Sequence, residues 1–125
     1  MAYKVSVING DGIGREIVPE ALRVLEATGV PFEWEHVLAG ELAVEQFSDP
    51  VPDSTAQSIL RNKIAIKGPL TNLVGRGWPS PNVLLRKKLG FFAAVKRARY
   101  FEGVPSPFKG ADFIVVREAR EDTYA

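Results

Sequence analysis

The sequence contains no cysteine among its 125 residues and only one histidine, His36. The absence of cysteine excludes a disulfide framework, a thiolate metal site and a thiol nucleophile, and it is usual in cytoplasmic proteins. One histidine cannot form a multi-histidine metal cluster. No apolar run approaches the roughly 20 residues that a membrane helix needs. We therefore expect a cytoplasmic protein without a signal peptide or a transmembrane segment.

The chain also has little excess charge, with 16 basic and 15 acidic residues and a net charge of +1. This balance gives no electrostatic reason to expect nucleic acid or an anionic membrane as a partner. The hydrophobic and charged fractions, 46% and 25%, are near the averages of globular proteins. A chain of this size has enough residues for one hydrophobic core. We expect a single domain over residues 1–125.

Strand-like and helix-like segments alternate along the chain. Strands are predicted over residues 3–8, 32–37, 63–66, 91–101 and 112–117, and helices over residues 16–27, 40–47, 54–61 and 82–89. Asp53 is a candidate cap for the third helix. This order predicts an α/β fold, a mixed sheet with helical crossovers. Sites in such folds lie beyond the carboxyl ends of the strands.

A glycine-rich turn, residues 10–14, connects the first strand to the first helix. A dinucleotide-binding fingerprint needs a third glycine where Arg15 stands, and Glu33 or Glu35 lies at the spacing expected for its ribose-binding acid. The alternative is a tight turn that starts the helix, with Asp11 near the helix's positive end. The residues alone favour the turn.

A long loop rich in glycine and proline follows the third strand over residues 68–81. Loops of about 15 residues inside a compact chain are usually functional or disordered. This loop and the start of the next helix offer neutral hydrogen-bonding side chains: Thr71, Asn72, Ser80 and Asn82. Ser80 or Asn82 is equally able to cap the helix, and one residue can serve both purposes.

Five cations form the next group of candidates: Arg86, Lys96, Arg97, Arg99 and Arg117. Guanidinium groups bind carboxylates through paired hydrogen bonds, so converging cations suit a substrate with two or three carboxylates. The alternative is a solvated sheet edge. Tyr124 is a candidate general acid beside such cations, although a residue next to the chain end is more often an idle surface residue.

The chain resembles the N-terminal part of the isocitrate/isopropylmalate dehydrogenase family, the metal-dependent β-decarboxylating dehydrogenases. The matching stretches occur in the family's order at residues 7–14, 67–71, 80–87, 103–107 and 116–125. The spacing Ser80-x-Asn82-x-x-x-Arg86 resembles the isocitrate branch. In this family the glycine turn is not a dinucleotide fingerprint, which further favours the structural interpretation of residues 10–14.

The resemblance implies an NAD- or NADP-dependent oxidoreductase that uses Mg²⁺ or Mn²⁺ to convert isocitrate to 2-oxoglutarate and CO₂. The residue roles that it implies are substrate binding by Ser80, Asn82, Arg86, Lys96 and Arg117, cofactor contact by Thr71 and Asn72, and proton donation to the enolate by Tyr124. The implied partners are isocitrate or a similar polycarboxylate and a second copy or a complementary chain, with no nucleic acid and no membrane.

The sequence departs from the family pattern at several points. Lys96 replaces a substrate arginine, Arg97 replaces the proline after it, and Ala119 replaces an asparagine. The family's metal-binding aspartates, catalytic lysine and adenine-binding loop lie downstream of the matched part. We therefore expect catalysis only with downstream or partner-chain residues. The alternatives are a non-catalytic tricarboxylate-binding or regulatory subunit and a truncated remnant.

Overall fold

The structure is a computed structural model that describes residues 1–72, 75 and 77–119. Two compact units divide the chain, Met1–Leu89 and Gly90–Ala125, and each is described by itself below. Parallel and antiparallel strand pairs both occur, and helices connect the parallel strands. The predicted α/β class with helical crossovers is therefore confirmed, with the two kinds of pairing in separate sheets. The prediction of one domain over residues 1–125 stays a prediction.

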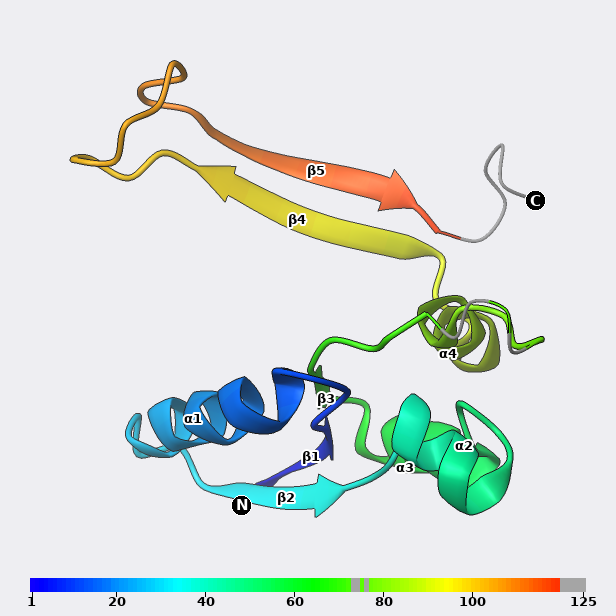
Figure 1. Cartoon of the computed structure of the whole chain (residues 1–125). Helices are drawn as coiled ribbons and strands as arrows, with labels where there is room; N and C mark the ends of the chain where they lie inside the picture. The colour runs from blue at the N-terminus through cyan, green and yellow to red at the C-terminus, as the bar shows by residue number, and fades with distance from the viewer. Residues whose placement is uncertain (73–74, 76, 120–125) are drawn as a thin grey trace. The chain divides into compact units, whose positions relative to one another are not determined.

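The first unit is built on a parallel sheet in the order β2-β1-β3 (Figure 1). The strands are β1 (Tyr3–Ile8), β2 (Phe32–His36) and β3 (Ala65–Lys67). The last four residues of the central strand β1 are all buried, because helices cover both of its faces. All three strands run in the same direction, so their carboxyl ends meet at one edge of the sheet.

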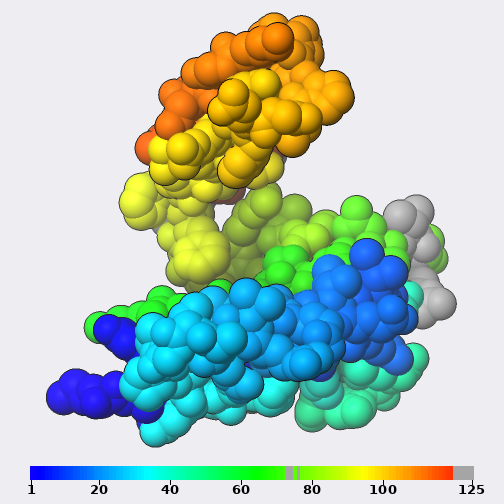
Figure 2. Space-filling model, turned by 90° about the vertical axis from the view of Figure 1, so that its left-hand side faces the viewer, coloured from blue at the N-terminus to red at the C-terminus, as the bar shows by residue number. Residues whose placement is uncertain are grey.

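Helices cover the two faces of this sheet through different sets of apolar side chains. On one face, α1 (Gly14–Glu26) packs Val18 and Leu22 against Val7 of β1. On the other face, Ile8 packs with Ile59 of α3 (Asp53–Asn62). The helices α2 (Glu41–Phe47) and α4 (Pro81–Leu89) complete the unit. The outer side of α1 faces solvent (Figure 2).

The predicted cap of α3 is wrong. Pro52 occupies the position before the helix, and no side chain caps the first turn by a hydrogen bond. Asp53 is already inside the helix, and its carboxylate accepts a hydrogen bond of 2.8 Å from Lys88 of α4. Lys88 also donates to the carbonyl oxygen of Val51 over 2.6 Å. The aspartate therefore helps to fasten α4 to the start of α3.

The second unit is an antiparallel ribbon of β4 (Ala93–Arg99) and β5 (Asp112–Glu118). Both strands agree with the sequence prediction to within two residues. Every residue of β5 is exposed, although its centre is apolar. Within the described residues each ribbon strand has one hydrogen-bonded neighbour, so each has an unpaired edge. No helix among the described residues is long and apolar enough to cross a membrane.

Candidate functional site

The carboxyl ends of the three parallel strands place three loop segments next to one another. The carboxylate of Asp11, which follows β1, is 2% exposed. It accepts the backbone N–H of Glu41 over 3.0 Å and the backbone N–H of Thr71 over 2.8 Å. Glu41 follows β2 in the chain and Thr71 follows β3, so one side chain joins all three strand-end segments at the edge where such folds place their ligands.

The glycine turn after β1 is explained by close packing of backbone. Gly10 has a φ of +78°, and a Cβ atom there would lie 2.1 Å from the carbonyl oxygen of Pro69. A Cβ atom on Gly14 would lie 2.2 Å from the carbonyl oxygen of Asn9. Glycine is needed at both positions because no side chain fits. These contacts support the structural interpretation of the turn.

Two residues of the long loop that the sequence singled out lie in direct contact. The hydroxyl group of Ser80 donates a hydrogen bond of 2.7 Å to the carboxamide oxygen of Asn72. The carbonyl oxygen of Ser80 accepts the backbone N–H groups of Val83 and Leu84, so Ser80 also begins α4. The side chain of Ser80 binds the loop and its main chain starts the helix.

Helix α4 presents two further candidates on one face. Leu85 is 6% exposed and packs in the core, which fixes the helix in the first unit. Asn82 and Arg86 are four residues apart, so their side chains lie one above the other along the helix. Asn82 is half-buried and Arg86 is exposed. The carboxylate of a ligand at this face would meet both the carboxamide of Asn82 and the guanidinium group of Arg86, which lie about one helical turn apart.

Lys67, at the end of β3, is a cation that our sequence analysis did not select as a site residue. Burial lowers its pKa, the positive charge of Arg86 lowers it further, and the negative charge of Asp11 opposes the shift. The ammonium group donates a hydrogen bond of 2.7 Å to the carbonyl oxygen of Gly68. Its position after Ala65 and Ile66 at a strand end was the available sequence signal.

The ribbon of the second unit carries two more candidates on one face. Arg117 is opposite Ala94, and Lys96 is opposite Val115, two residues further along each strand. Lys96 and Arg117 are therefore diagonal neighbours across the strand pair. Both side chains are exposed. The register places two cations side by side on the same surface of the ribbon.

Arg97 projects from the opposite face and is engaged in an ion pair. Its Nε and Nη2 atoms donate hydrogen bonds of 2.9 and 2.7 Å to the two oxygens of Asp112. These bonds raise the pKa of Arg97 and lower the pKa of Asp112. Arg99 is directly opposite Asp112 in the register and so shares this face. Arg97 is therefore an exposed, ion-paired residue of the sheet, as the solvated-edge alternative predicts.

The candidate residues divide between the two units. The first unit holds five of the candidates predicted from the sequence: Thr71, Asn72, Ser80, Asn82 and Arg86. Two of these, Asn72 and Ser80, are in direct contact. The second unit holds Lys96 and Arg117 as diagonal neighbours across its strand pair. The role of Tyr124 stays a prediction, because this residue lies outside the described residues.

The model of one protein family, described as isocitrate/isopropylmalate dehydrogenase, matches residues 4–125. The chain belongs to the isocitrate/isopropylmalate dehydrogenase family. The resemblance inferred from the five sequence stretches is thereby confirmed.

Relatives within the isocitrate/isopropylmalate dehydrogenase family include proteins with different nicotinamide cofactors in their names. The NADP isocitrate dehydrogenase of Haloferax volcanii is 43% identical over 97% of this chain and 30% of its own length. The mitochondrial NAD isocitrate dehydrogenase subunit 2 of Saccharomyces cerevisiae is 39% identical over 98% of this chain and 33% of its own. The chain thus spans about a third of the length of these relatives.

A solved isocitrate dehydrogenase from Methylococcus capsulatus has a similar fold. It superposes with a TM-score of 0.88 and is 47% identical, over 97% of this chain and 35% of the solved chain. The fold predicted from the family resemblance is therefore confirmed for the N-terminal part of an isocitrate dehydrogenase.

The metal ion that the family implies does not find a complete ligand set in the described part of this chain. Among residues 1–72, 75 and 77–119, no three histidine, aspartate or glutamate side chains come together to hold a metal ion. The hydroxyl, carboxamide and cationic groups described above are hydrogen-bonding and charge-pairing groups, which suit an organic anion better than a divalent cation.

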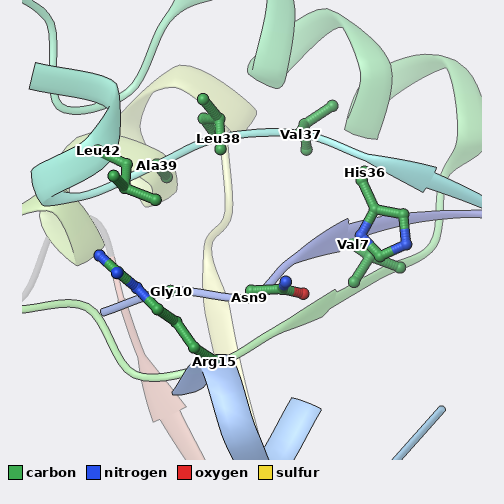
Figure 3. Close-up of a pocket in the computed structure, with 9 residues that line it drawn as sticks. All are labelled: Val7, Asn9, Gly10, Arg15, His36, Val37, Leu38, Ala39 and Leu42. Atoms are coloured by element: carbon green, nitrogen blue, oxygen red, sulfur yellow. The ribbon is translucent and has the colours of Figure 1, made fainter. Parts of the chain in front are cut away.

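A pocket of about 240 Å³ lies at the ends of β1 and β2 (Figure 3). Its polar lining comes from Asn9 after β1, Arg15 of α1 and His36 of β2, and the rest is mostly apolar. The side-chain oxygen of Asn9 is buried without a hydrogen-bond partner among the described residues. The pocket is lined by none of the predicted substrate residues.

Proposed function

We propose that this chain carries the isocitrate-binding half-site of an NAD(P)-dependent isocitrate dehydrogenase and needs downstream or partner-chain residues for catalysis. The observation that carries the proposal is the position of Asn82 and Arg86, which lie four residues apart on one face of α4, directly after Ser80. A hydroxyl, a carboxamide and a guanidinium group within about two helical turns can bind the oxygens of a carboxylate, so this arrangement favours a polycarboxylate ligand. Membership of the family makes isocitrate the first candidate.

The first unit contributes most of the proposed substrate contacts. Arg86 pairs with one carboxylate, since charge-assisted hydrogen bonds are the strongest contacts available in water. The Ser80 hydroxyl donates its proton to Asn72, so its oxygen accepts from the substrate's hydroxyl group. The carboxamide of Asn82 donates to a carboxylate oxygen of the substrate. Ser80 reaches this position already oriented by its bond to Asn72. Thr71 and Asn72 contact the nicotinamide end of the cofactor.

The family resemblance also implies substrate binding by Lys96 and Arg117 of the second unit. Arg117 has the forked geometry that binds a carboxylate through two hydrogen bonds, whereas Lys96 supplies charge without the fork. We propose that Tyr124 donates a proton to the enolate carbon after decarboxylation. In that step the bond to the β-carboxylate breaks, CO₂ leaves, and the phenolic proton forms the new C–H bond of 2-oxoglutarate.

Cofactor and metal enter this proposal from the family rather than from this chain's contacts. NAD or NADP would supply the hydride-accepting chemistry when bound, and relatives with either cofactor in their names occur. Mg²⁺ or Mn²⁺ would have to be held by residues outside those described here. The substrate-binding role therefore rests on the hydroxyl, carboxamide and cationic groups of this chain alone.

The proposed partner is a second copy or a complementary chain, and the ribbon supports it. Ile114 is 63% exposed and Val116 is 67% exposed, beside unpaired strand edges. Exposed apolar strands of this kind bind other strands or associate with one another. The relative from Saccharomyces cerevisiae is named as subunit 2 of an isocitrate dehydrogenase. We expect a cytoplasmic protein that binds neither nucleic acid nor membrane, as the charge balance indicates.

A second candidate function is a non-catalytic tricarboxylate-binding or regulatory subunit. The lysine at position 96, where the family usually places an arginine, favours this alternative, because a binding site tolerates the loss of forked geometry better than a catalytic one. A truncated remnant without a ligand is the third possibility. These three alternatives differ in binding and turnover, so one titration separates them.

The test is a titration of isocitrate into the purified chain, with and without Mg²⁺ and NADP or NAD, followed by thermal unfolding. Isocitrate at 100 times its dissociation constant should stabilise the chain by about 2.7 kcal/mol. Succinate, which lacks the hydroxyl and the third carboxylate, is the matched control ligand. Binding without cofactor reduction supports the half-site or the binding subunit. No stabilisation by isocitrate under any condition contradicts both.

Activity then separates the first two functions. The half-site proposal expects cofactor reduction when a chain supplying the family's downstream part is added, and a binding subunit remains inactive in that mixture. Reduction by the pure 125-residue chain would contradict the requirement for a second part. The alanine variant of Ser80 should weaken isocitrate binding in every case in which the wild type binds.

A further inference from the structure

Asp11 occupies a site that is shaped for a carboxylate. The side chain is 2% exposed, and its two oxygens accept two different backbone N–H groups, Oδ1 from Glu41 and Oδ2 from Thr71. The donors come from segments 30 and 60 residues away in the sequence. A carboxylate is the short side chain that accepts at both of its terminal atoms, so aspartate satisfies both donors at once.

The space around this carboxylate is equally specific. Gly40 has a φ of +87°, and a Cβ atom there would lie 2.3 Å from Oδ2 of Asp11. The backbone N–H of Asp11 donates to the carbonyl oxygen of Pro69 over 2.8 Å. The carboxylate therefore has a glycine on one side and the loop after β3 on another. Small movements of this side chain must move Thr71 with it.

Asp11 also contributes to the electrostatics of Lys67. Burial lowers the pKa of Lys67, the charge of Arg86 lowers it further, and the negative charge of Asp11 opposes the shift.

We propose that Asp11 is a positioning residue for the isocitrate and nicotinamide site, holding the backbone of Thr71 in place. This inference rests on the function proposed above, since it assigns Asp11 a role in that same site. Asp11 touches neither substrate nor cofactor in this role. It acts through Thr71.

The test compares Asp11→Asn with Ser58→Ala in the full 125-residue chain. Ser58 is also 2% exposed, and its hydroxyl hydrogen-bonds to Ser6 over 2.7 Å, so its loss lowers stability without touching the loop after β3. Asparagine keeps one acceptor and turns a donor toward the other backbone N–H. We expect Asp11→Asn to weaken isocitrate binding about tenfold or more, because the loop is no longer preorganised.

A further readout separates positioning from a general loss of stability. Amide hydrogen exchange at Thr71 and Glu41 should become faster in Asp11→Asn and stay unchanged in Ser58→Ala. Equal loss of affinity in both variants, or normal exchange at Thr71 in Asp11→Asn, would overturn the proposal.

Failure of the inference can be distinguished from failure of the proposed function. If the wild-type chain does not bind isocitrate, the proposed function is wrong, and normal exchange at Thr71 in Asp11→Asn then overturns the positioning role as well. Asp11→Ser, which places a small hydroxyl acceptor in the same space, replaces Asp11→Asn if the latter does not fold. Unfolding of both variants would show that Asp11 serves the fold alone and would overturn the proposal.

Discussion

Burial lowers the pKa of Lys67 at the end of β3, and the positive charge of Arg86 on α4 lowers it further. The two residues are 19 positions apart in the sequence, one at the end of a strand and one within a helix. The negative charge of Asp11 opposes the shift. An anion bound to Arg86 would offset the effect of its charge on the lysine.

Replacement of Arg86 by glutamine should change both the lysine and the ligand affinity. The pKa of Lys67 should rise toward its ordinary value, because the neighbouring positive charge is gone. Isocitrate binding should weaken about tenfold to a hundredfold, as expected for the loss of a charged hydrogen bond. Nuclear magnetic resonance titration of the lysine side chain and isothermal calorimetry measure the two effects.

Lys87→Gln is the matched control for this prediction. Lys87 is exposed on the same helix and has no hydrogen bond or ion pair within the described part of the chain. An equal loss of affinity in Lys87→Gln would indicate a general effect of net charge and would count against a local role of Arg86.

Lys88 should contribute measurably to stability because it connects α4 to the start of α3. Its ammonium group donates to the carboxylates of Asp53 over 2.8 Å and Asp49 over 3.2 Å, which raise its pKa. It also donates to the carbonyl oxygen of Val51 over 2.6 Å. Lys88→Met should lower the free energy of unfolding by about 1 kcal/mol. Chemical denaturation measures the loss, with Lys87→Met expected to stay within about 0.5 kcal/mol of wild type.

Glu35 should give the chain part of its sensitivity to acid. Hydrogen bonds from Asn62 and Arg61 lower its pKa below the usual value of 4.5. The folded state therefore favours the carboxylate, which stabilises the fold above pH 4.5 and ceases to do so as the pH falls through the lowered pKa. Glu35→Gln should be less stable than wild type at neutral pH and lose less stability on acidification.

Thermal midpoints measured from about pH 7 down to about pH 3 check this sign. Glu45→Gln provides a control, since Glu45 is exposed and has no partner among the described residues. Parallel curves for wild type and Glu35→Gln would contradict the prediction.

The ribbon should drive self-association through the apolar side chains of β5. Val116 is 67% exposed and is opposite Val95, which is 66% exposed. Val116→Lys should shift the chain toward monomer in analytical ultracentrifugation, because a charge on an exposed strand opposes edge pairing. Val104→Lys adds the same charge outside the two strands and should leave the distribution unchanged. The prediction is wrong if both substitutions act equally.

Patterns of neighbouring residues in the sequence predicted the helices and strands well, but they could not predict contacts between residues far apart in the chain. The period-two and helical patterns placed β1 over its full length and β5 to within one residue, since these patterns depend on neighbours in the chain. The mistaken cap at Asp53 arose from an offset of one residue at a helix start. The sequence also predicted the helical face that Asn82 and Arg86 share, because a four-residue spacing fixes it.

The roles of Lys67 and Asp11 could not be predicted in the same way. The effect of Arg86 on Lys67 exists only because β3 and α4 approach in space, and Asp11 meets donors far away in the sequence. The central residues of β5 form an apolar run that usually indicates burial, yet all are exposed in the structure. Whether an apolar strand is exposed depends on which other segments cover it, and the residue pattern of the strand itself does not indicate those segments.

A Cβ atom built at Gly40 would lie 2.3 Å from the Asp11 carboxylate, so the residues allowed at position 40 depend on the residue at position 11. The fold should tolerate a residue other than glycine at position 40 only in a chain in which Asp11 has already been replaced. Designers who recombine segments of related enzymes with a junction between these positions should therefore inherit both from the same parent.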